Sequence, residues 1–192
     1  MSPAAVLVLV SSAPGLQGQG KGKKAKGPKE GRVVDCSRQS LAEEILKLQS
    51  AKDPKPATLT VKGVCNESIF IQGLDLRLIA HKDGATITGG TPLPLRVSDY
   101  AIFVSSSRRV TISGFFILPA SGGGVLCQRF SDCHRVDNTI DTTTGAGSGV
   151  TVGTGAYLNL TGNIIRGFNV GIFALSDRTV HLLVDRGDQP TR

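Results

Sequence analysis

A chain of 192 residues is long enough for one domain with a sizeable core. It has 24 glycines and no tryptophan, and Val, Ile, Thr and Ser fill its periodic segments, which favours short strands joined by tight turns. The formal charge of +7 does not indicate a nucleic-acid-binding face, because much of it comes from the basic residues gathered in residues 20–32 and the remainder is nearly neutral. The sequence therefore predicts no nucleic-acid partner.

The first residues have features of an export signal. Residues 4–10 form an apolar run that is too short to cross a bilayer, and small residues follow it up to Ala13. We interpret residues 1–13 as a signal peptide or its remnant, although the positive charge that usually precedes such a run is missing. A start codon placed too late and an ordinary chain terminus are the alternatives. The interpretation predicts a secreted protein, extracellular or periplasmic, and no other stretch suits a membrane span.

Residues 14–32 have almost no apolar side chains to bury, and we expect a disordered basic linker there. A short strand is predicted at 33–36, and a helix follows it. Ser40 and Glu43 have the spacing of a capping box, in which each side chain satisfies a free amide at the helix start. One apolar face unites Leu41, Ile45 and Leu48. A helix of about ten residues in this position would cover the open first coil of a repeat structure.

A repeat follows the helix. Short strands are expected first, at 59–61, 68–71, 76–79 and 85–87. A fourfold pattern of alternating residues then has its first phase at 101–104, 124–127, 149–152 and 171–174. Its second phase falls at 110–112, 133–135, 158–160 and 180–182. Units of this length made of alternating strands are typical of a solenoid, whose units bury their apolar faces against their neighbours. We expect the solenoid to span residues 33–187, with a tail at 188–192.

Four motifs carry a family resemblance, namely 34–36 (Val-Asp-Cys), 63–67 (Gly-Val-Cys-Asn-Glu), 110–114 (Val-Thr-Ile-Ser-Gly) and 160–163 (Leu-Thr-Gly-Asn). With the capping helix, they resemble the secreted bacterial parallel β-helix repeat proteins of the pectate-lyase-like superfamily. The resemblance implies an all-β, right-handed parallel β-helix solenoid with an N-terminal capping α-helix. It also implies that Asn138 and Asn163 stack at a strand-to-strand turn, bond their neighbours and accept left-handed backbone. Phe115 and Asp185 depart from this pattern.

Two columns of the repeat contain unusual side chains. Arg135 falls in the inward column of Ile112, Leu160 and Leu182, where a charge is costly, so we expect either a bulged coil or a carboxylate within its reach. One outward column is polar throughout and contains Thr111, His134, Asn159 and His181.

The candidates for catalysis are His134, Asp137 and Asp141. The segment 138–141 faintly resembles the Asn-Thr-Asp motif of polygalacturonases, but an isoleucine interrupts it, and the other catalytic motifs of that family are absent. His134 could act as a base while Arg135 or Arg109 binds an acidic sugar. The simpler interpretation is that the acids belong to turns and that the histidines are exposed. No cofactor and no metal site are predicted.

Four cysteines in an exported chain predict two disulfides, for which three connectivities are possible. Cys127 and Cys133 flank a five-residue turn, whereas Cys36 and Cys65 flank the expected helix. Proximity favours Cys36–Cys65 and Cys127–Cys133. A metal site is disfavoured because no Cys-x-x-Cys occurs.

The function expected from these observations is non-catalytic, with a polysaccharide as the partner or a role at the cell surface. The alternative is a polysaccharide lyase or glycoside hydrolase, so the sequence leaves enzymatic activity open. The segment after residue 184 contains no amphipathic stretch that could cover a last coil. We therefore expect either a truncated chain or end-to-end self-association through that coil.

Overall fold

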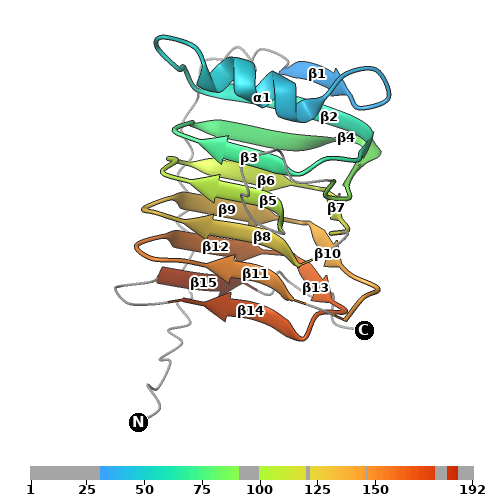
Figure 1. Ribbon diagram of the computed structural model, residues 1–192, viewed down its shortest axis with the longest axis vertical. Coiled ribbons are helices and arrows are strands. Elements are labelled where there is room, and N and C mark those ends of the chain that lie inside the picture. The colour runs from blue at the N-terminus through green and yellow to red at the C-terminus, as the bar shows by residue number, and fades with distance from the viewer. Residues whose placement is uncertain (1–30, 91–99, 120–121, 146, 176–180, 186–192) are drawn as a thin grey trace, which may run out of the picture.

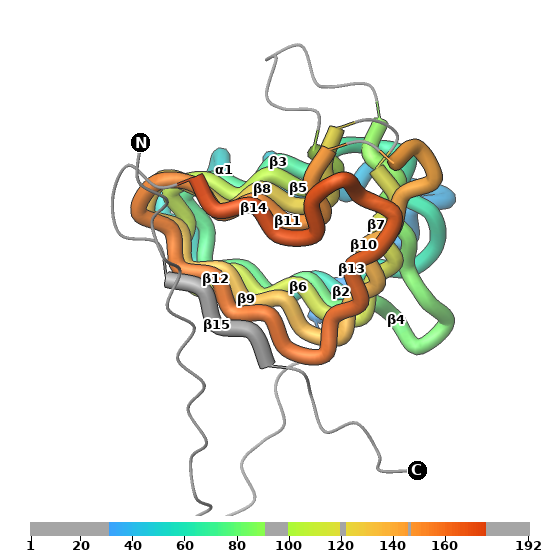
Figure 2. Tube along the Cα trace, turned by 90° about the horizontal axis from the view of Figure 1, so that it is seen from below, coloured from blue at the N-terminus to red at the C-terminus, as the bar shows by residue number. Residues whose placement is uncertain are grey.

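The computed structural model describes residues 31–90, 100–119, 122–145, 147–175 and 181–185, which form an all-β parallel β-solenoid with one short helix (Figure 1). The expected signal, nearly all of the expected linker and the tail at 188–192 lie outside the described residues. Seen along its axis, the coils superimpose as a tube with three sides (Figure 2). Every strand pairing is parallel, so each coil stacks on the next in the same direction.

The three sides are named here by their strands. The long face contains β1 (Arg32–Asp35), β2 (Ala57–Cys65), β4 (Leu76–Ile87), β6 (Val110–Ser113), β9 (Asp132–Val136), β12 (Tyr157–Thr161) and β15 (His181–Asp185). The short face contains β7 (Phe116–Ile117), β10 (Thr139–Asp141) and β13 (Ile164–Arg166). The five-stranded sheet contains β3 (Ile69–Gln72), β5 (Tyr100–Ser105), β8 (Gly123–Gln128), β11 (Ser148–Val152) and β14 (Val170–Ala174).

The strand β4 turns the corner between the long and short faces. Its first half pairs with β6 and its second half with β7. The sequence predicted separate strands at 76–79 and 85–87, because Asp83-Gly84 has turn chemistry. Gly84 does adopt a positive φ of 90°, but the strand continues through it. The two halves are therefore one bent strand.

The core fills the inside of the tube. On the strands whose side chains the structure describes, alternate side chains point inward, and those of Ile112, Leu158, Val125, Val150 and Ile140 are fully buried. They come from all three sides of the coil. The first-phase columns predicted from the sequence are confirmed, since Ile102 pairs with Val125, and Val150 pairs with both Val125 and Ile172.

An asparagine ladder joins the coils at the turn between the long and short faces. The amide N of Phe115 donates to Asn138 Oδ1 at 3.0 Å, and the amide N of Asn138 donates to Asn163 Oδ1 at 3.0 Å. Asn163 Nδ2 in turn donates to the carbonyl oxygen of Arg135 at 2.6 Å. These bonds satisfy backbone groups that the turn would otherwise leave unpaired.

The left-handed backbone of this turn does not belong to the asparagines. A positive φ occurs one residue earlier in each coil, at Gly114, Asp137 and Gly162. The expectation for Asn138 and Asn163 was wrong on this point. Because the preceding residue makes the sharp turn, the asparagine side chain is free to point along the stack and bond the adjacent coils.

The register of the last strand differs from the expected one by two residues. The sequence aligned His181 with Asn159 and Leu182 with Leu160, but Tyr157 pairs with His181 and Leu160 pairs with Val184. Asn159 therefore pairs with Leu183 rather than with His181, and Asp185 pairs with Thr161 rather than following Asn163. A shift by two keeps the inward and outward alternation intact, so periodicity alone could not detect it.

Both expectations for Arg135 were also wrong. The coil does not bulge there, because Arg135 pairs in continuous register with Ile112 on one side and Leu160 on the other. Its side chain points into the core and is fully buried. No carboxylate reaches it within the described part of the chain, and its hydrogen bond goes from Nη1 to the carbonyl oxygen of His134 at 3.2 Å.

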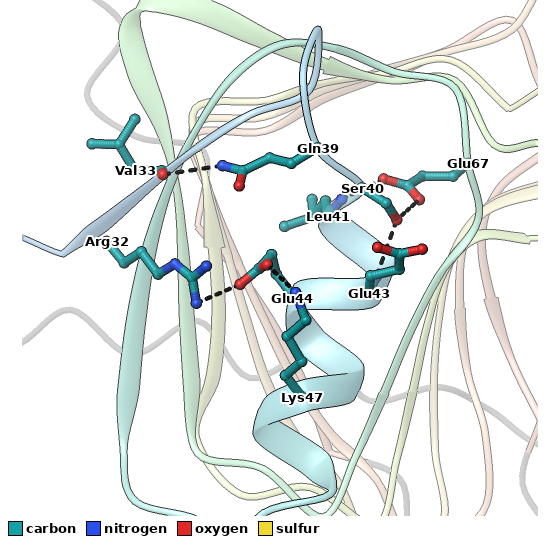
Figure 3. Close-up of polar contacts among 9 residues, drawn as sticks. All are labelled: Arg32, Val33, Gln39, Ser40, Leu41, Glu43, Glu44, Lys47 and Glu67. Atoms are coloured by element: carbon teal, nitrogen blue, oxygen red, sulfur yellow. Dashed lines mark hydrogen bonds and ion pairs between the residues drawn. The ribbon is translucent and has the colours of Figure 1, made fainter.

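The helix α1 (Leu41–Gln49) covers the first coil beside β3, as predicted (Figure 1). Ser40 Oγ accepts from the amide N of Glu43 at 3.0 Å, which is the expected half of the capping box. The carboxylate that bonds the helix start is that of Glu67, from the turn after β2. It accepts from the Leu41 amide N and from Ser40 Oγ, each at 2.6 Å (Figure 3). A residue of the first coil therefore helps to hold α1, the helix that covers this coil.

The pKa values of two carboxyl groups make this cap sensitive to acid. A hydrogen bond from Lys47 and the positive charges of Arg32 and Lys47 hold the pKa of buried Glu44 below its usual value. Hydrogen bonds from Ser37 and Lys62 lower the pKa of Asp35 to about 2. A carboxyl group with a lowered folded-state pKa stabilises the fold above its unfolded pKa. That stabilisation is lost as the pH falls through the folded-state value.

We therefore expect the thermal midpoint of the wild type to fall between about pH 5 and pH 2, and to fall less steeply in Glu44→Gln. The exposed neighbour Glu43 provides the control, since Glu43→Gln should keep the wild-type slope. Differential scanning calorimetry across this range measures both slopes. Equal slopes for wild type and Glu44→Gln would show that Glu44 does not carry the effect.

Candidate functional site: the polar face

Two outward columns of side chains cross the long face. Alternation along each strand brings the same positions of successive strands into line. The first column lies at the strand starts and contains Asp75, Arg109, Asp132 and Tyr157; the second contains Arg77, Thr111, His134 and Asn159. We call these eight residues the polar face. Neighbouring members of a column are about 4.8 Å apart, the spacing of paired strands.

Charges alternate within the first column. The guanidinium of Arg109 forms an ion pair with Asp75, from the strand before it. Asp132 Oδ1 lies 3.1 Å from Nε2 of His134, two residues along the same strand. This contact lacks hydrogen-bond geometry, so its attraction depends on protonation of the imidazole. About a third of the His134 side chain is exposed, which leaves the ring accessible from outside.

The second column presents hydrogen-bonding groups and one cation. Arg77 is exposed, and among the described residues no carboxylate forms an ion pair with it. Thr111 and Asn159 are half-buried and supply a hydroxyl group and an amide. The ring of Tyr157 lies beside that of His134, with centroids 6.0 Å apart and planes tilted by 52°. The polar face therefore combines a cation, neutral hydrogen-bonding groups and two rings.

The three catalytic candidates from the sequence lie in different places. His134 belongs to the polar face, whereas Asp137 is the left-handed residue of the turn after β9. Asp141 lies on the short face, where its carboxylate accepts from Arg166 Nε at 2.7 Å. These three side chains therefore do not form one acid–base site. Arg135 points inward and cannot hold a sugar beside His134, whereas Arg109 is on the right face but is paired with Asp75.

Sequence analysis missed Arg77, Asp132 and Tyr157 as members of one surface. Arg77 lies in a strand that was expected, but the repeat was aligned only from residue 101. Arg77 pairs with Thr111, and the two residues are farther apart in sequence than neighbouring coils of the aligned repeat, because residues 91–99 lie between their strands. Asp132 pairs with Tyr157, and only the structure places both beside His134.

The predicted cysteine pairs are at disulfide distance. The Cα atoms of Cys36 and Cys65 are 5.1 Å apart, and those of Cys127 and Cys133 are 6.6 Å apart. Within the described ranges no three His, Cys, Asp or Glu side chains gather closely enough to hold a metal ion. Nor does the described part of the chain contain a helix long and apolar enough to span a membrane.

The fold and the polar face define this protein as a parallel β-solenoid with one laterally extended polar surface. No family model matches the chain, and neither the curated proteins nor the solved structures contain a match. The class therefore rests on the architecture itself, and function has to be argued from the surface.

Proposed function

We propose that the polar face binds a polysaccharide chain outside the cytoplasm without cleaving it. The observation that carries the proposal is the two regular columns of polar side chains, which repeat at strand spacing across four successive coils. A polymer of identical units can make similar contacts with each coil. Arg77 and His134 favour a polymer that bears carboxylate groups. The two disulfides support a location outside the reducing cytosol.

Electrophoresis through gels that contain polygalacturonate, alginate or dextran tests this function. The wild type should be retarded by at least one acidic polymer, and Arg77→Ala should weaken binding by roughly tenfold, the loss of one charged hydrogen bond. Arg166→Ala is the matched control, because it removes the same charge from the short face. The proposal fails if no polymer retards the wild type, or if both variants lose binding equally.

The contact between Asp132 and His134 favours a second candidate, a lyase that acts on the same polymers. Asp132 would orient the ring and stabilise the imidazolium after His134 abstracts a proton next to a uronate carboxylate. The C–O bond to the leaving sugar would then break as the double bond forms, and the leaving oxygen would take a proton from the imidazolium or from water. The new carbon–carbon double bond absorbs ultraviolet light. Incubation with polygalacturonate or alginate should produce this absorbance with wild type and not with His134→Gln. A lack of absorbance with wild type leaves binding as the function.

A further inference from the structure

An exposed aromatic ring lies at the edge of the polar face. Phe130 is in the turn between β8 and β9, two residues before Asp132, and 71% of it is exposed. Phe130 and its neighbour Arg129 both have left-handed backbone, with φ of 60° and 57°. Such backbone is energetically unfavourable for a residue other than glycine. Because most of the ring is exposed, its burial offsets little of this unfavourable energy.

The fold does not require phenylalanine at this position. The residue with the same left-handed backbone is Ser106 in the preceding coil and Gly155 in the following coil. A small side chain, or none, therefore suffices in both neighbouring coils. Large apolar side chains that are exposed and strained at once point to a role outside the core.

The ring is nevertheless held in place. A Cβ atom built on Gly155 would lie 2.5 Å from both Cδ1 and Cε1 of Phe130, so the ring rests in the space that any side chain at 155 would fill. The disulfide between Cys127 and Cys133 closes the turn that carries it. The amide N of Arg129 also donates to the carbonyl oxygen of Thr154 at 3.1 Å. A ring fixed in this way loses little conformational freedom when it binds a ligand.

The charges around the ring match those of the polar face. Arg129 is its neighbour in sequence, and the amide N of Ser106 donates to the carbonyl oxygen of Arg129, which brings Arg108 of the preceding coil into the same edge. Both guanidinium groups belong to exposed residues. The edge thus carries one exposed aromatic ring and two exposed arginines, next in sequence to the first column.

We propose that Phe130 is a stacking platform for one sugar ring of an acidic polysaccharide, an inference that rests on the proposed binding function. The apolar C–H face of a sugar lies on the aromatic ring, whose face carries partial negative charge. The carboxylate of the sugar is directed to Arg108 or Arg129. The binding site therefore extends beyond the polar face and around the starts of its strands to the β8–β9 turn.

Binding of Phe130 variants to polygalacturonate and alginate, measured in the same gels, tests this platform. Phe130→Ala and Phe130→Leu should both weaken binding by roughly threefold to tenfold, because leucine keeps the apolar bulk but lacks the flat ring. Phe130→Tyr should bind like the wild type. Phe116→Ala is the matched control, since Phe116 is 52% exposed but lies on the short face.

Thermal unfolding of the same variants separates this role from a structural one. Phe130→Ala should keep or raise the thermal midpoint, because the ring is exposed and its backbone is strained. The platform is refuted if Phe130→Ala binds as tightly as Phe116→Ala while Arg77→Ala is impaired, a result that leaves the polar face standing. It is also refuted if Phe130→Leu binds like wild type. If neither polymer binds the wild type, the platform and the proposed function fall together.

Discussion

Replacing Arg135 with leucine is expected to raise the free energy of unfolding by about 1–4 kcal/mol. The Arg135 side chain is fully buried in a column whose neighbours are Ile112 and Leu160. Its Nε and Nη2 atoms have no hydrogen-bond partner among the residues that the structure describes. A buried charge without a counter-charge destabilises a fold, and a well-packed apolar side chain of similar size removes that cost.

The pH dependence of this effect provides an independent check. Burial lowers the pKa of Arg135 from its usual value to about 9. Between these values the unfolded chain binds more protons than the folded one, so the stability of the wild type rises with pH. Below about pH 9 the destabilisation is present in full. The advantage of Arg135→Leu should therefore be largest at neutral pH and shrink at about pH 10.

Denaturant unfolding at both pH values measures the two differences. Arg166→Leu serves as the control, because Arg166 is mostly exposed and its replacement should change stability by less than about 1 kcal/mol. A leucine variant less stable than the wild type at neutral pH would mean that Arg135 has a partner which the described residues do not provide.

Removing the Cys36–Cys65 disulfide is expected to cost about 3–4 kcal/mol. The two cysteines are 29 residues apart, and the bond between them closes a loop that contains α1. Closing a loop of this length restricts the unfolded chain considerably. Cys127 and Cys133 are only 6 residues apart, so their removal should cost about 2 kcal/mol.

The two double variants, each with both cysteines replaced by alanine, form a matched pair for denaturant unfolding. Hydrogen exchange should in addition show α1 opening early in the Cys36→Ala/Cys65→Ala variant, because the helix then keeps its attachment through Ser40, Leu41 and Glu67 but loses its covalent one. An equal cost for both pairs would mean that strain in the folded state, rather than loop length, sets the contribution of each bond.

Periodicity predicted the parts of this fold that repeat without interruption. Alternation located the first-phase strands and their inward residues, and the helix was recognisable from Ser40 and its apolar face. The strands β7 and β10 have two and three residues, which is too short to produce an alternating signal. The register of β15 failed because the spacing from β14 is two residues longer than in earlier coils.

The candidate site was predictable only in part. His134 was accessible to sequence analysis because the four-coil alignment placed it outward. Its contact with Asp132 depends on side-chain conformation, and the place of Arg77 depends on a strand outside the aligned repeat. Arg135 fell into an inward column by counting alone, but the absence of a carboxylate near it among the described residues depends on everything packed around it.

The stacking of similar coils makes the length of the proposed binding surface adjustable in steps of one coil. Each coil contacts only its neighbours, so a duplicated unit spanning Gly123–Gly147 would meet the same partners above and below. The duplication would add another His134 and Phe130 at strand spacing and lengthen the surface by about 4.8 Å. Affinity for long polymers would then increase with the number of coils while affinity for single sugars stayed constant, as in a multivalent receptor.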